Sequence, residues 1–317
     1  MVVSQAELDL MELTAAYFAK LFGVAEADVP AACSQAIADS DLRYELPSAL
    51  TRDEIILRVL NHIDSDKPTT VGQHRADIWE SCWSENLQRF VDAGLKVESL
   101  VPHFITPGLP VRLNRDYALP SSPRCEASVL EVCRAFLFDK FFKEVQSIYE
   151  FGCGSGFNLV ALSQQMPGKK LYGLDWSKSS NETVNLIRDK LDLDITGQHF
   201  DFFDPDPSLK LSGNSAVLTM CALEQVGARH ERFMKYLLEQ KPEICVNMEP
   251  LVELYDEKQL IDHLALRYHK KRGYLEGFLP ALESFRLKGL VEILDVRRLF
   301  FGSLYHEGYS YVVWRPL

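Results

Sequence analysis

The sequence predicts an α/β protein in which an all-helical N-terminal module precedes a doubly wound, mostly parallel sheet. From residue 123 onward, short apolar runs alternate with helical patterns, as in parallel strands joined by crossover helices. A glycine-rich turn joins the first of these runs to a helical pattern, and residues 1 to about 100 carry helical patterns alone. We therefore expect a helical module and linker over residues 1–122 and the α/β domain over residues 123–317.

Three helices are expected in the N-terminal module. The first begins at the capping box Ser4–Glu7 and ends at Gly23. The second begins at the capping box Thr51–Glu54, and the third carries Ile78 to Phe90 and ends at Gly94.

Two tryptophans in the third helix, Trp79 and Trp83, are four residues apart and therefore share one face. We favour a helix–helix core for them, and the alternative is an aromatic wall for a substrate or a dimer partner.

The glycine-rich turn opens the α/β domain. After a helix that Ser122 is expected to cap, the apolar strand Ser147–Phe151 leads into Gly152, Gly154 and Gly156, and a helical pattern follows. Because glycines have no Cβ, they let the backbone turn sharply and approach a ligand closely. The start of the following helix offers free N–H groups to polar or anionic ligand atoms. The dinucleotide pattern G-x-G-x-x-G fails, because Phe157 stands where its third glycine belongs.

Acidic residues end the next two strands. Asp175 ends a strand roughly 20 residues past the turn, where a carboxylate reaches ribose hydroxyls in nucleotide-binding folds. Asp201 ends a third strand, in which Gln198–Phe202 is the expected carboxyl end, and Ser215–Cys221 and Ile244–Met248 are buried fourth and fifth strands. Each acid alone is typical of a solvated loop. Right-handed crossovers, however, would bring all these strand ends to one edge.

The last two strands are expected over Val291–Leu299 and Tyr309–Trp314. The turn Phe301–Gly308 is too short for a helical crossover, so we expect an antiparallel hairpin.

Over about residues 123–317, the acid-G-x-G-x-G run, the two strand-end acids and the final hairpin resemble the class I S-adenosylmethionine-dependent methyltransferases. The resemblance implies a Rossmann-like domain with S-adenosyl-L-methionine as cofactor. In that family the strand-two acid binds the ribose and the strand-three acid the adenine amino group. The cofactor-binding residues that it implies here are Glu150, Gly152, Gly154, Gly156, Asp175, Trp176, Asp201, Phe202 and Cys221.

The acceptor is expected beyond the ends of strands four and five and at the hairpin turn, where open α/β sheets bind ligands. Methyl transfer to a hydroxyl of high pKa needs a proton acceptor, whereas a good nucleophile needs only to be positioned. The candidate catalytic residues are His306, His230 and Glu224, with His269 and Glu249 as further candidate bases. The candidate substrate-binding residues are Arg115, Tyr117, Glu249, Tyr255, Arg267, His269 and Tyr305. The segment 101–122 is either a solvated linker or a segment that folds over the pocket, as often in this family.

The composition and net charge limit the class of protein and the partners that we expect. Hydrophobic residues make up 47% and charged residues 25% of the 317 residues, as in ordinary globular proteins, and the net charge of −11 argues against a nucleic-acid partner. The seven cysteines form no C-x-x-C pair and are interpreted as reduced and buried. We expect no metal site, although scattered carboxylates leave Mg²⁺ bound with the substrate as an alternative. With no apolar stretch typical of a signal peptide or membrane span, we expect a cytoplasmic protein without a membrane partner.

These observations favour a methyltransferase that acts on a small polar metabolite, by O-methylation of a sugar derivative or a natural-product intermediate. The N-terminal module would cap the pocket or form a homodimer. The alternatives are a protein or peptide methyltransferase and a non-catalytic binding protein that keeps the cofactor fold.

Overall fold

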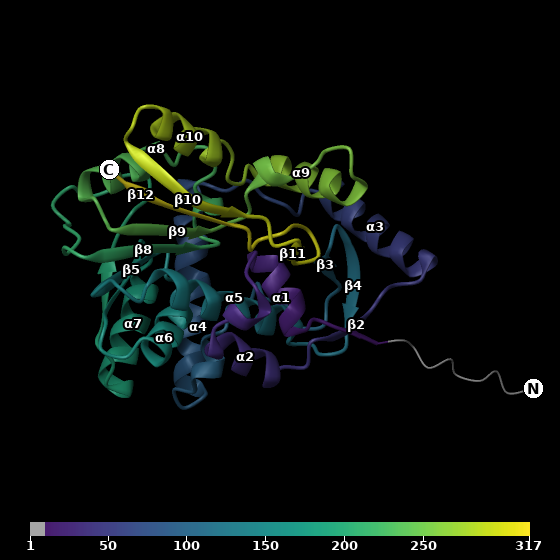
Figure 1. Cartoon of the computed structure of the whole chain (residues 1–317), viewed down its shortest axis with the longest axis horizontal. Helices are drawn as coiled ribbons and strands as arrows, with labels where there is room; N and C mark the ends of the chain where they lie inside the picture. Colours follow the sequence, from purple (N-terminus) through teal and green to yellow (C-terminus); the bar gives the residue numbers. More distant parts are fainter. Residues whose placement is uncertain (1–9) are drawn as a thin grey trace, which may run out of the picture.

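The computed structural model describes residues 10–317, which contain two β-sheets and the helices that pack around them (Figure 1). The larger sheet has seven strands in the order β10-β12-β9-β8-β5-β6-β7. Its strands are β5 (Ser147–Phe151), β6 (Lys170–Asp175), β7 (Ile195–His199), β8 (Ser215–Met220), β9 (Ile244–Met248), β10 (Val291–Arg297) and β12 (Tyr311–Pro316).

Five strands of this sheet, β5 to β9, are parallel, and β12 runs antiparallel to both β9 and β10. The predicted doubly wound sheet with its C-terminal antiparallel hairpin is therefore confirmed. The hairpin register pairs Ile293 with Trp314, whose indole is fully buried and donates to Asn247 Oδ1 of β9.

Helices cover both faces of the larger sheet. α5 (Cys125–Phe141), α6 (Phe157–Gln165) and α7 (Lys178–Leu191) pack on one face, and α8 (Glu231–Gln240) and α10 (Phe278–Leu287) pack on the other. Because successive strand residues point to opposite faces, Ile148 belongs to the first of these cores and Tyr149 to the second.

The prediction of an all-helical N-terminal module is wrong. The second sheet has the order β1-β2-β4-β3-β11, and four of its five strands come from the first 122 residues. They are β1 (Met11–Glu12), β2 (Arg43–Glu45), β3 (Val111–Leu113) and β4 (Asp116–Pro120). The fifth, β11 (Phe301–Gly302), lies in the predicted hairpin turn and pairs Phe301 with Leu113. The expected linker is thus a β-hairpin that receives a strand from the far end of the chain.

The N-terminal helices are α1 (Ala15–Phe22), α2 (Ala31–Ala38), α3 (Ala49–Asp64) and α4 (Ala76–Asp92). The capping box predicted at Ser4–Glu7 lies outside the described residues. Within them α1 begins after Thr14, whose hydroxyl accepts from Tyr17 N, and it ends at Gly23 as predicted. α2 was not predicted. Phe22 of α1 stacks on Phe136 of α5 with ring centroids 4.0 Å apart, so one core runs across residue 122.

Two helix starts differ from the prediction by a few residues. α3 begins earlier than its expected capping box, because the Ser48 hydroxyl accepts from Thr51 N. α5 begins at Cys125, and the Ser122 hydroxyl accepts from Arg124 N in the turn before it.

α4 lies against α7 beside the larger sheet, and α9 (Leu260–Arg272) lies against α3 beside the smaller one (Figure 1). No helix within residues 10–317 combines the length and the apolar character that crossing a lipid bilayer requires. All seven cysteines are free; Cys82 is exposed and Cys221 half-buried, in contrast to the expected burial.

Candidate active site

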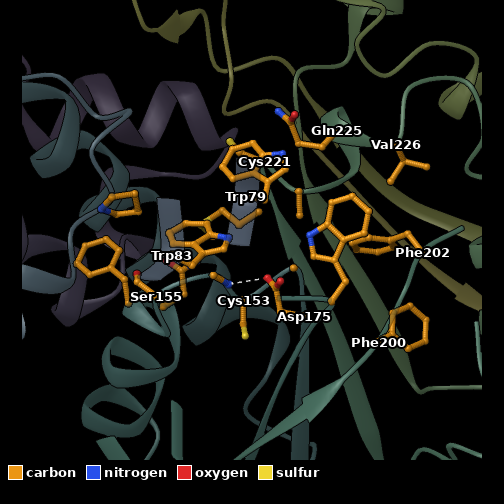
Figure 2. A pocket seen from close by; sticks show the side chains of 18 of the residues that line it. Trp79, Trp83, Cys153, Ser155, Asp175, Phe200, Phe202, Cys221, Gln225 and Val226 are labelled. Atoms are coloured by element: carbon orange, nitrogen blue, oxygen red, sulfur yellow. Dashed lines mark hydrogen bonds between the residues drawn. The ribbon is translucent and has the colours of Figure 1, made fainter. Parts of the chain in front are cut away.

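Two adjoining cavities open at the carboxyl ends of the parallel strands. The first chamber is formed by the glycine-rich turn, the ends of β6 and β8, the segment after β7, and α4 (Figure 2). Its walls include Trp79, Trp83, Phe104, Gly152, Gly154, Asp175, Trp176, Phe202, Cys221 and Gln225. Six of the nine predicted cofactor-binding residues therefore lie together in this chamber.

The glycines of the turn are required by geometry. Gly152, Gly154 and Gly156 have φ of +73°, +52° and +72°, a region that side-chain-bearing residues rarely adopt. A Cβ at Gly154 would lie 2.5 Å from the Trp83 ring, and one at Gly152 would lie 2.4 Å from Ala222 Cβ. The turn thus lets other groups approach its backbone closely.

Asp175 is fixed at the end of β6 and faces the first chamber. Its Oδ2 accepts from Gly154 N at 3.0 Å (Figure 2). Its Oδ1 accepts from Ser177 N at 2.9 Å. Burial raises the pKa of this carboxyl to about 6, although the two backbone hydrogen bonds act to lower it. A carboxylate has about four acceptor positions, so two are left to accept from a ligand.

Two residues predicted to bind the cofactor lie beneath the turn instead of in the chamber. Glu150 is buried, and its Oε1 accepts from Asn158 Nδ2 at 2.7 Å, while Asn158 Oδ1 accepts from Arg134. Burial raises the pKa of Glu150 to about 8. Gly156 precedes α6 and faces Ile187. Both residues therefore support the turn from below.

Asp201 lies in a neighbouring groove on the other side of Trp176, a residue that lines both spaces. The Asp201 Oδ1 accepts from Phe203 N at 2.8 Å. The next residue, Phe202, does line the chamber, opposite Trp79 and Trp83 (Figure 2). The structure thus brings the predicted aromatic contact into the chamber but leaves the predicted adenine acid outside it.

α4 covers the first chamber. Trp79 and Trp83 stack with centroids 5.8 Å apart and line the cavity, so the favoured interpretation of a helix–helix core is wrong. Between them on the helix, Glu80 accepts from the Ser177 hydroxyl at 2.7 Å, Lys178 N at 2.8 Å and Ser179 N at 3.2 Å. A carboxylate at the N-terminus of α7 satisfies free N–H groups and favours the helix dipole. Glu80 therefore docks α4 onto the α/β domain.

The second chamber has a volume of about 330 Å³ and shares Trp79, Phe104, Cys221 and Gln225 with the first. Cys221 stands where the chambers meet, directly after β8, with a left-handed φ of +53°. The walls of the second chamber are rich in ionisable groups, namely Arg75, Glu126, Glu224, Tyr268, Arg272, Tyr274, Tyr305, His306 and Tyr309.

Glu224, one of the predicted catalytic residues, lines the second chamber. It lies in the loop after β8, and its Oε1 accepts from Gln225 Nε2 at 2.7 Å. Burial and the nearby Glu249 raise the pKa of Glu224 to about 8. Glu249 is fully buried and accepts from the backbone N–H of Ala222, Leu223 and Glu224, so it shapes the loop without reaching the chamber.

His306 also lines the second chamber, with His269 behind it. The His306 Nδ1 and His269 Nε2 share a hydrogen bond of 2.9 Å. Burial, Arg112 and Arg272 lower the pKa of His306 to about 3, and burial and His306 lower that of His269. Both rings are therefore neutral at pH 7 and weak bases. Tyr255 lies deeper, where its hydroxyl accepts from Glu307 N.

The other predicted residues are scattered. Tyr305 lines the second chamber. His230 lies away from both chambers, with its Nε2 3.0 Å from the Glu276 carbonyl oxygen. Arg267 pairs with an exposed carboxylate at the end of α3, and the Arg115 guanidinium lies over an aromatic ring outside the chambers. The fully buried Tyr117 packs in the core between α3 and α9.

Several lining residues were not predicted, above all Arg75, Phe104 and Glu126. They lie outside the strand–turn–helix units from which the site was inferred. The spacing of Arg75, Trp79 and Trp83, each four residues apart, was the one available signal, because it places a cation and two aromatics in one row. Within residues 10–317 no group of three or more His, Cys, Asp or Glu side chains is arranged to hold a metal ion.

The chain has the architecture of the class I methyltransferases that its motifs resemble, a parallel sheet ending in an antiparallel hairpin with a glycine-rich turn after its first strand. No protein-family model matches the sequence, and no curated protein matches it significantly.

Solved structures match the fold at low similarity. The pyocyanin biosynthetic protein PhzM is 11% identical with a TM-score of 0.44, over 62% of this chain and 59% of that protein. The plantazolicin methyltransferase BpumL, solved with S-adenosylhomocysteine, is 13% identical with a TM-score of 0.41, over 77% and 98%. The [4+2]-cyclase SpnF is 12% identical with a TM-score of 0.49, over 78% and 96%. Because these proteins differ in activity and the scores are low, we base the function on the site itself.

Proposed function

We propose that the protein is an S-adenosylmethionine-dependent methyltransferase that methylates a small polar metabolite on oxygen. The observation that carries this proposal is the joining of two chambers at Cys221. One holds the glycine-rich turn and Asp175, and the other holds Glu224 among further ionisable groups. A cofactor in the first chamber and an acceptor in the second would meet at this junction.

The residues of the first chamber fit S-adenosyl-L-methionine. Asp175 has two free acceptor positions for the ribose hydroxyls, and Trp176 and Phe202 offer aromatic surfaces to the adenine. At Gly154 the Trp83 ring lies against the bare backbone, where a Cβ would be 2.5 Å from it. When bound, the cofactor supplies a methyl group activated by a sulfonium.

The protein's own part is to position the acceptor and to take its proton. Glu224 follows Cys221, the residue at the junction, by three positions in the sequence and lines the second chamber, where the acceptor would bind. A carboxyl whose pKa is about 8 is a stronger base than an ordinary glutamate once it is deprotonated, so it suits removal of a hydroxyl proton. Trp79 and Phe104 wall both chambers and would exclude water from the reacting atoms.

The acceptor chamber supports a small substrate. Its volume of about 330 Å³ lies at the lower end of small-molecule pockets, roughly 300–1,000 Å³. Aromatic and ionisable walls suit a compact molecule with polar substituents, such as a sugar derivative or a natural-product intermediate.

The test is calorimetry with S-adenosylhomocysteine on the wild type and on Asp175→Asn. Loss of charged-acceptor hydrogen bonds to the ribose should weaken binding by about 2–4 kcal/mol, or roughly 30- to 900-fold. Asp189→Asn, an equal charge change at an exposed position of α7, is the control and should bind like the wild type. Unchanged affinity in a folded Asp175→Asn variant would show that this carboxylate does not hold the ribose. Methyl transfer from labelled S-adenosylmethionine to pooled metabolites, with peptides as comparison, then identifies the acceptor.

A further inference from the structure

We propose that the acceptor carries an anionic group, a carboxylate or a phosphate, which Arg75 and Arg272 bind jointly in the second chamber. This inference rests on the proposed function, because it names the acceptor class of the same site. It follows from two guanidinium groups that line this chamber without an ion-pair partner among residues 10–317.

The fold brings the two arginines together from distant parts of the chain. Arg272 is the last residue of α9, and its carbonyl oxygen accepts from Val71 N at 2.8 Å. The short 3-10 helix Gln73–Arg75 follows directly, and both arginine side chains line the second chamber. Burial and the nearby Arg272 lower the pKa of Arg75, which places one cation within the field of the other.

In the described part of the chain, neither cation lies within ion-pair distance of a carboxylate. Among residues 10–317, neither guanidinium takes part in an ion pair. Nε of each arginine is buried without a hydrogen-bond partner. Arg75 Nη1 donates to the Thr69 hydroxyl at 3.0 Å, and the two guanidinium groups lie over the rings of Trp79 and Tyr274. Buried donors without partners are rare, and two guanidinium forks at one cavity match the oxygens of a carboxylate or phosphate.

The acidic residues of the chamber do not neutralise these cations. Glu224 and Glu126 both line it, but burial raises their pKa values to about 8 and about 7. Near neutral pH they are largely or partly protonated, and Glu126 already accepts from the Tyr309 hydroxyl at 2.8 Å. Burial disfavours the charged form of both acids, although the nearby Arg272 acts to lower the pKa of Glu224. The two guanidinium groups at the wall therefore favour an anion over a neutral or cationic acceptor.

Anchoring also explains how the acceptor would be oriented. An anion held on Arg75 and Arg272 leaves the rest of a compact molecule in contact with the other walls of the chamber, where Glu224, Gln225 and Cys221 lie. Its hydroxyl would then be presented to the base and to the junction of the chambers. Such fixing of a remote group is how binding energy orients a reacting atom.

Calorimetry with three related probes at constant ionic strength tests the proposal on the full-length protein. The probes are 4-hydroxybenzoate, phenyl phosphate and the neutral 4-hydroxybenzamide. We expect at least one anion to bind the wild type, and the amide to bind at least 10-fold more weakly. Arg75→Gln and Arg272→Gln should each weaken the anion by about 10- to 100-fold, because each removes a charge-assisted pair. Arg267→Gln, the same change on the exposed side of α9, should bind like the wild type.

Binding of the carboxylate alone, the phosphate alone or both tells which anion the acceptor carries. If no anion binds, if the amide binds equally well, or if both arginine variants retain full affinity, the proposal is overturned. Phenylglyoxal labelling of arginines in the wild type, measured by mass spectrometry, tests the same site without any variant, so it remains informative if a variant misfolds. The anion that binds should protect Arg75 and Arg272 but not Arg267, and equal labelling with and without it refutes the site. Retained S-adenosylhomocysteine binding in the same preparation distinguishes failure of this inference from failure of the proposed function.

Discussion

Removal of the Glu80 carboxylate is expected to release α4 from the first chamber. That chamber has a volume of only about 100 Å³, whereas pockets for small molecules usually measure roughly 300–1,000 Å³. Trp79 and Trp83 must therefore move before a molecule the size of S-adenosylmethionine is enclosed. Glu80 holds them in place by accepting from Ser177, Lys178 and Ser179 at the start of α7.

The magnitude follows from the capping geometry. Loss of a side-chain cap costs about 0.5–2 kcal/mol, and loss of a negative charge at a helix N-terminus adds about 0.3–1 kcal/mol. The Ser177 hydroxyl still accepts from Ser180 N, so α7 keeps its own cap. We therefore expect Glu80→Ala to weaken α4 docking by about 1–2 kcal/mol and to lower the unfolding midpoint by roughly 1–3 °C.

Tryptophan fluorescence reports the release directly. Three of the four tryptophans line the first chamber, and the fourth, Trp314, is fully buried. Glu80→Ala should shift the emission to longer wavelength and increase quenching by acrylamide. Glu85→Ala, an exposed position on the same helix, is the matched control. Emission and quenching that match the wild type in Glu80→Ala would refute the docking role.

The same contact predicts a pH dependence. Burial alone would raise the pKa of Glu80, but the hydrogen bonds from Ser179, Ser177 and Lys178 outweigh it and lower that pKa. A carboxylate with a lowered folded-state pKa stabilises the docked state above its unfolded pKa, and this stabilisation is lost as the pH falls through the folded value. Acidification below about pH 4.5 should therefore increase quenching in the wild type. It should have little further effect in Glu80→Ala.

Three further predictions concern the acceptor side and the N-terminal segment. Glu224→Gln should lower turnover about 10²- to 10⁴-fold and abolish the rise of rate with pH around 8, with unchanged S-adenosylhomocysteine affinity; a retained pH profile would exclude this base. His306→Gln should change turnover by less than about 10-fold, because a ring whose pKa is lowered to about 3 is a weak base. A loss as large as that of Glu224→Gln would show that His306 is the base. Deletion of residues 1–122 should give an insoluble or unfolded protein, since it uncovers Phe136 and removes the partner of β11; a fragment with a cooperative thermal transition would contradict this.

The seven-stranded sheet could be predicted because its signals are local. Strands β5, β8 and β9 are short apolar runs, and three alternate glycines mark the turn after Phe151. The third strand was predicted less well, because β7 holds one apolar residue, Ile195, and ends at His199 instead of Asp201. The end of a strand also fixes which residue lies at the carboxyl edge of the sheet, so the position of Asp175 in the first chamber could be predicted from spacing alone. The final hairpin followed from one loop length, which excludes a crossover helix.

The smaller sheet could not be predicted in the same way. Its strands have two to five residues, too few for an alternating pattern to stand out, and β11 pairs with β3 from the other end of the sequence. The short length of Phe301–Gly308 predicted a turn between two antiparallel strands. It could not show that Phe301 pairs with Leu113 within that turn.

For the site, residue type was a poor guide to role because burial decides it. His230 and Glu224 are six residues apart in one loop region, yet Glu224 faces the second chamber while His230 packs beside α10. A histidine titrates near neutrality in water, but burial and two arginines remove that property from His306. Burial acts in the opposite direction on Glu224 and raises the pKa of its carboxyl to about 8. Nothing in the sequence distinguishes this residue from an ordinary glutamate.

Under the proposed function, the pairing of β11 with β3 would connect substrate selection to the N-terminal segment. β11 lies between the two hairpin strands, so its pairing with Leu113 and Arg112 fixes the chain just before Tyr305 and His306. The same N-terminal segment also supplies Arg75, Trp79 and Phe104 to the chambers. Asp175, the carboxylate that we propose binds the ribose, comes from the parallel sheet, whereas much of the wall of the second chamber comes from outside it. Changes in residues 10–122 should therefore alter which acceptor is bound while leaving the residues around Asp175 in place.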